Sequence, residues 1–65
     1  MTNEEKIRVF KSMQTAALTQ GLVLEGVRTY SSNAMRAHID AAMVSIHIHA
    51  DDLGRAITQL IVEAG

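Results

Sequence analysis

The sequence predicts an α+β fold: a two-layer αβββα sandwich whose three-stranded antiparallel meander carries both helices on one face. Two observations predict it. Apolar and polar residues alternate with period two between residues 34 and 50, as in a pair of strands that have one face in water. Apolar residues recur at helical spacing on either side of this segment, in stretches that would cover the apolar face of the sheet.

The first predicted helix covers residues 3–20. Thr2 and Glu5 have the spacing of a capping box, in which each side chain reaches the backbone amide of the other residue. Gly21 follows at the position where a helix commonly ends. The apolar stripe of this helix is expected to comprise Ile7, Phe10, Met13, Ala17 and Leu18.

Three strands are predicted next, at residues 22–30, 34–40 and 43–49. The first is rich in β-branched residues. Its apolar residues change from one face of the strand to the other, which indicates either a β-bulge at Gly26 or outward valines covered by a partner. Small polar residues predict a turn at 31–33. The third strand would form an apolar sheet edge without Lys or Pro, and natural proteins usually cover or pair such an edge.

The second helix is predicted over residues 51–65, with Asp51 as its N-cap. Each buried Leu or Ile contributes about 1.5–3 kcal/mol to folding, so replacing Ile57 or Leu60 by Ala is expected to unfold so small a domain. The apolar stripe comprises Leu53, Ala56, Ile57, Leu60, Ile61 and Ala64.

Length and charge restrict the function classes. Residues 1–65 make one domain near the smallest size that folds alone, and the chain has no cysteine for a disulfide. A homo-oligomer, most simply a dimer, is therefore expected to add stability. The net charge of −1 and the scattered basic residues disfavour nucleic acid as a partner. Without a signal-peptide pattern or a long apolar run, a cytoplasmic protein that does not enter the membrane is expected.

The predicted function is a non-catalytic protein–protein interaction module, a small inhibitor or adaptor of a larger protein. It would act through the outer sheet face and the edge strand, and no cofactor is expected. The candidate partner-binding residues are Arg36, His38, Ser45, His47 and His49.

Two other function classes stay open. His38, His47 and His49 would share the outer sheet face, because residues two apart on a strand point the same way, and they are the candidate ligands of a metal-binding protein. The same histidines would make an interface sensitive to pH. The remaining class is a small enzyme subunit whose active site forms at an oligomer interface, since no nucleophile or phosphate-binding motif occurs within the chain.

Overall fold

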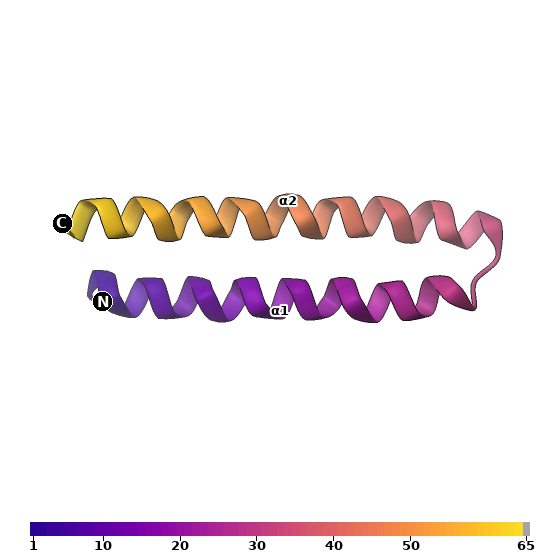
Figure 1. Cartoon of the computed structure of the whole chain (residues 1–65), viewed down its shortest axis with the longest axis horizontal. Helices are drawn as coiled ribbons and strands as arrows, with labels where there is room; N and C mark the ends of the chain where they lie inside the picture. Colours follow the sequence, from indigo (N-terminus) through magenta and orange to yellow (C-terminus); the bar gives the residue numbers. More distant parts are fainter. Residues whose placement is uncertain (65) are drawn as a thin grey trace.

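The computed structural model describes residues 1–64, which form two long antiparallel α-helices joined at one end (Figure 1). Helix α1 spans Asn3–Thr29 and helix α2 spans Asn33–Ala64. Residues 30–32 connect them, and both termini lie at the far end from this loop. The hairpin measures 49 × 14 × 13 Å, and its Cα radius of gyration is 15.0 Å. A compact chain of this length would have a radius of gyration of about 11 Å.

The predicted α+β sandwich is wrong, because the described residues contain two helices and no strand. The first predicted strand is the second half of α1, and the other two belong to the first half of α2. Gly21 and Gly26 lie inside α1 and have no positive φ, so neither one ends the helix or forms a bulge. The second predicted helix is the last part of α2 as far as Ala64, and Gly65 lies outside the described residues.

A heptad pattern in α2 explains why this chain is helical throughout. Its inward-facing residues recur with alternating spacings of three and four, which is the pattern of a coiled coil. The alternation that predicted strands arises because Val44 and Ile48, on the outer side of the same helix, are apolar as well. The inward-facing residues of α2 are Arg36, Ile39, Met43, Ile46, Ala50, Leu53, Ile57 and Leu60.

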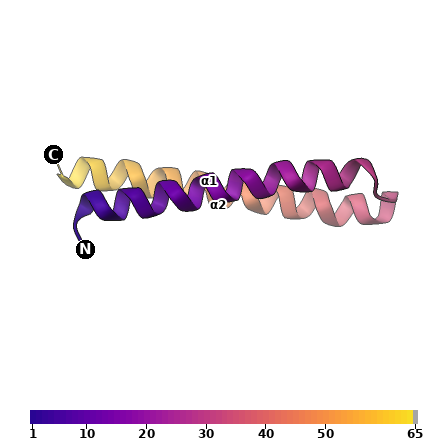
Figure 2. The same cartoon turned by 90° about the horizontal axis from the view of Figure 1, so that it is seen from below.

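Helix α1 contributes a matching set of inward-facing residues with the same spacing. Together the two sets form what we call the core seam, and Figure 2 shows the helices crossing near its middle. Met13 and Leu18, which the sequence placed in the core, lie outside the seam and are about half exposed. The α1 members of the core seam are Ile7, Phe10, Gln14, Ala17, Gly21 and Leu24.

The helix ends are capped by side chains. The backbone amide of Glu5 donates to Oγ1 of Thr2 at 3.1 Å, which confirms the predicted N-cap of the first helix. At the loop, the amide of Met35 donates to Oγ of Ser32 at 3.3 Å. Oγ of Ser31 donates to the carbonyl of Val27 at 2.7 Å. The loop therefore supplies partners for backbone groups that each helix end leaves unpaired.

Candidate functional site

The three histidines lie apart on α2. Residues two apart on a helix differ by about 200° around its axis, so His47 and His49 face opposite flanks. His47 lines a hollow beside Leu18 and Glu25 of α1. His38 shares a flank with His49, but eleven residues separate them, or about 16 Å along the helix. Among the residues described, no three His, Asp or Glu side chains are grouped to hold a metal ion, so the metal-binding alternative is wrong.

Arg36 and Ser45 both form hydrogen bonds within the hairpin. Nε of Arg36 donates to the carbonyl of Arg28 at 3.1 Å, and Nη2 donates to that of Thr29 at 3.5 Å. A guanidinium at this position satisfies the last carbonyls of α1, where the helix dipole also favours a cation. Oγ of Ser45 donates to the carbonyl of Ala41, one turn earlier in α2.

The sheet face and edge strand through which the interaction module would act do not exist within residues 1–64. That form of the functional hypothesis is therefore wrong. Partner contact by Arg36, His38, Ser45, His47 or His49 from a helical surface stays a prediction.

A two-pronged ion pair joins the helices near the loop. Nε of Arg28 lies 2.7 Å from Oδ1 of Asp40, and Nη2 lies 3.3 Å from Oδ2. The hydrogen bond from Arg28 is the largest cause that lowers the pKa of Asp40. Desolvation opposes it, and the charges of Arg28 and Arg36 each add a smaller lowering effect on this pKa. The same hydrogen bond raises the pKa of Arg28. Arg28 follows Leu24 in the heptad spacing of α1 but is exposed, so the pair joins the last turn of α1 to the side of α2.

A second apolar stripe runs along α1 as far as its C-cap. Each member directly precedes a heptad position of α1 and is therefore rotated about 100° away from α2. The stripe carries no charged residue and is exposed along its length, with Val23 61% and Tyr30 93% accessible. We call this surface the α1 stripe. It consists of Val9, Met13, Ala16, Gln20, Val23, Val27 and Tyr30.

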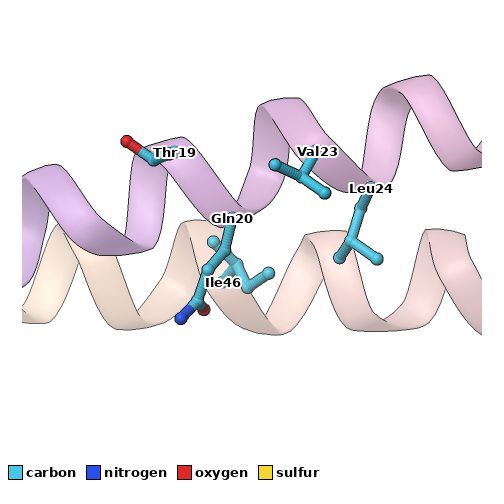
Figure 3. A pocket seen from close by; sticks show the side chains of 5 residues that line it. All are labelled: Thr19, Gln20, Val23, Leu24 and Ile46. Atoms are coloured by element: carbon cyan, nitrogen blue, oxygen red, sulfur yellow. The ribbon is translucent and has the colours of Figure 1, made fainter.

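The α1 stripe is continuous with the incompletely covered core. Where it borders α2, a hollow of about 350 Å³ is lined by Thr19, Gln20, Val23, Leu24 and Ile46 (Figure 3). Figure 3 shows Leu24 directed toward α2 and Thr19 directed away from it. Leu24 and Ile46 belong to the core seam, yet both are only half-buried. One apolar surface therefore extends from the core seam onto the outside of α1.

On the same flank, α2 presents a mostly polar stripe. In an antiparallel helix pair, the residues that precede heptad positions in both helices lie on the same side of the pair. Aspartate, glutamate, histidine, serine and glutamine alternate here with a few small or apolar residues. We call this surface the α2 stripe. It consists of Met35, His38, Ala42, Ser45, His49, Asp52, Ala56, Gln59 and Glu63.

Comparison of the chain with protein-family models, with curated proteins and with solved structures gives no match. Within residues 1–64, neither helix has a stretch long and apolar enough to cross a bilayer. The arrangement of the hairpin's own surface is therefore the basis for a functional proposal.

Proposed function

We propose that this chain is a self-assembling subunit, and that two hairpins pair through the flank carrying the α1 stripe to form a four-helix bundle. In such bundles, four helices share one core of apolar heptad positions. The proposed role is assembly, without catalysis of its own. The observation that carries the proposal is the uncharged, mostly apolar stripe on one flank of α1 from Val9 to Tyr30.

The surface area of the hairpin supports this proposal. Its accessible surface is 4792 Å². A compact monomer of 7.1 kDa would expose about 4,100 Å². The difference of about 700 Å² is close to the roughly 800 Å² that each partner buries in a standard protein–protein interface. Pairing with one more copy would therefore bring the exposed area into the normal range.

The incomplete core also supports a second copy. Several side chains of the seam, including Phe10, Leu24 and Ile46, are only half-buried by the other helix. Helices that face a bundle core usually carry apolar residues at three of seven positions, whereas a two-helix seam needs only two. The α1 stripe supplies two further positions in each heptad, and these side chains stay exposed in a single hairpin.

A second copy fits this surface better than an unrelated charged partner. The α1 stripe has no charge that a complementary surface would have to neutralise. Self-pairing through one patch is the commonest form of protein oligomer, and it adds buried area to a chain too short for a large core of its own.

The test is the solution mass of matched Val→Glu variants, measured by light scattering over a concentration series. Val23 lies in the α1 stripe and is 61% exposed, whereas Val44 lies on the outer side of α2 and is 59% exposed. We expect Val23→Glu to raise the dimer Kd at least tenfold, because a charge buried without a partner costs more than the roughly 1.4 kcal/mol that a factor of ten represents.

Val44→Glu is the control and is expected to leave the Kd unchanged. Circular dichroism would verify that both variants remain helical, which is expected because Glu is a better helix former than Val. A dimer that Val44→Glu disrupts and Val23→Glu does not would overturn the proposed surface. A wild-type chain that stays monomeric would overturn self-assembly itself.

A further inference from the structure

We infer that the two hairpins pair head to tail, with α1 packed antiparallel against α1 of the second copy and the two loops at opposite ends. This inference rests on the proposed self-assembly. A symmetric dimer through this flank has two possible arrangements. The two-fold axis lies in the interface plane and is either parallel or perpendicular to the long axis of the hairpin. The first places the loops together and sets α1 against the partner's α2. The second places the loops at opposite ends and sets each helix against its own copy.

The chemistry of the two stripes favours the head-to-tail arrangement. With the loops together, the α1 stripe would cover the partner's α2 stripe and would remove His38, His49 and Asp52 from water. In the α1 stripe, only Gln20 and Tyr30 carry polar side-chain groups that could bond to them. Burial of polar groups without hydrogen bonds is unfavourable. With the loops apart, the α1 stripe covers an identical apolar stripe. The two α2 stripes then face each other as polar surfaces that water can enter.

The α1 stripe also has a self-complementary register. Its spacings alternate between four and three, so an antiparallel copy centred on residue 18 brings each member from Val9 to Val27 opposite another member. No charge faces a charge in this register. The pairs are Val9 with the partner's Val27, Met13 with the partner's Val23, and Ala16 with the partner's Gln20.

The ends of the stripe fix this register against sliding. Lys6 precedes the first stripe residue at the same heptad spacing, and it would lie opposite the partner's Tyr30, whose exposed ring suits an ammonium group. A slide of one heptad in one direction would place Lys6 against the partner's Val23. A slide in the other direction would carry Val9 beyond the end of the partner's α1.

Disulfide trapping tests the arrangement, because the natural chain has no cysteine. Chains carrying Val9→Cys are mixed with chains carrying Val27→Cys under mild oxidation, and each variant is also oxidised alone. A disulfide needs Cα atoms within about 7 Å. In the head-to-tail dimer, the two positions are opposite each other, whereas two copies of the same position are about 27 Å apart along the axis. We expect the mixed species to form several-fold faster than either same-position species.

The control mixture combines Val27→Cys chains with His38→Cys chains, which would face each other in the loops-together dimer. Rapid trapping of this pair, with none between positions 9 and 27, would overturn the inference. Light scattering on the reduced variants separates the two levels of the argument. If the reduced variants are dimers but no 9–27 disulfide forms on oxidation, the arrangement alone is contradicted. If the wild-type chain is a monomer, the proposed self-assembly is contradicted.

Discussion

The side-chain amide of Gln14 donates a 3.0 Å hydrogen bond to the backbone carbonyl of Ala50, across the core seam from α1 to α2. One turn further along α2, a Cβ placed on Gly54 would lie 3.1 Å from the same amide nitrogen. An alanine at position 54 would therefore press on the amide of Gln14, which would have to shift by a few tenths of an ångström. A polar residue at a heptad core position commonly sets the register of a coiled coil. We infer that this contact fixes how α1 is aligned along α2.

Gln14 and Gly54 are expected to be energetically coupled. Gln14→Ala removes one part-buried hydrogen bond and should lower the free energy of unfolding by about 1 kcal/mol. Gly→Ala within a helix raises it by up to about 1 kcal/mol, but at position 54 the gain should be smaller because the amide of Gln14 must move. In the Gln14→Ala background, the Gly→Ala change at position 54 should give the full increase in the free energy of unfolding.

Urea denaturation of both single variants and the double variant, at one fixed chain concentration, measures this coupling. Gly26→Ala provides the reference gain, because a Cβ there would meet nothing within 4 Å. Strict additivity of the Gln14 and Gly54 changes would contradict the contact.

Two isoleucines of α2 differ in burial and should therefore differ in their contribution to the free energy of unfolding. Ile57 is 8% exposed in the core seam, whereas Ile48 is 58% exposed on the outer side. Ile57→Ala should lower the free energy of unfolding by about 2–5 kcal/mol through lost apolar contact and the remaining cavity. Ile48→Ala should change it little, because Ala is the better helix former and little buried surface is lost. Thermal unfolding followed by circular dichroism compares them, and equal losses would contradict the assignment of the seam.

Asp40 should contribute to the pH dependence of stability. Its pKa is lowered in the folded hairpin by the hydrogen bond from Arg28. The unfolded chain, in which an aspartate titrates near about pH 3.9, therefore binds the proton more readily. The stabilising contribution is complete above that pH and is lost as the pH falls through the lower folded pKa.

Asp40→Asn should accordingly reduce the loss of stability between neutral and acidic pH. The comparison variant is Asp52→Asn, because Asp52 lies 3.6 Å from Arg55 within α2 and does not join the two helices. Melting temperatures measured from pH 7 down to about pH 3 test this. An Asp40→Asn variant as acid-sensitive as the wild type would argue against the ion pair.

Several local features of the fold were predictable from the sequence. The N-cap at Thr2 and the helical stripes near both ends were predicted, and Leu53, Ile57 and Leu60 are indeed buried. Of the first predicted stripe only Ala17 is buried, and Ile61 of the second is 56% exposed. The helical spacing was therefore right, but the buried face was only partly assigned. The helix N-cap predicted at Asp51 is wrong, since that residue lies within α2.

The middle of the chain was misread for a physical reason. Ile46 faces α1 whereas Ile48 faces outward, and two apolar residues on opposite sides of a helix reproduce the alternation of a strand. Glycines at 21 and 26 resembled breaks, but packing of a long amphipathic helix outweighs a cost of about 1 kcal/mol for each. The heptad spacing over residues 36–60 was the signal that distinguished the two structures.

The candidate surface was only partly visible in the sequence. A β-bulge at Gly26 was the favoured interpretation of residues 22–30, and outward valines covered by a partner were the alternative. The structure has no bulge there and places Val23 and Val27 on the exposed side of α1. The remaining members were divided between a predicted helix and a predicted strand, which hid their common spacing. The expectation of a dimer came from the short chain, the absence of cysteine and a sheet edge that the structure does not contain within residues 1–64, and it stays a proposal.

Sedimentation equilibrium of the wild-type chain tests the central claim most directly. Self-assembly through the α1 stripe predicts that the mass rises with concentration to twice the 7.1 kDa of one chain and goes no further. A mass of one chain at every concentration would contradict the claim, because the uncharged surface along α1 would then be stable in water without a second copy.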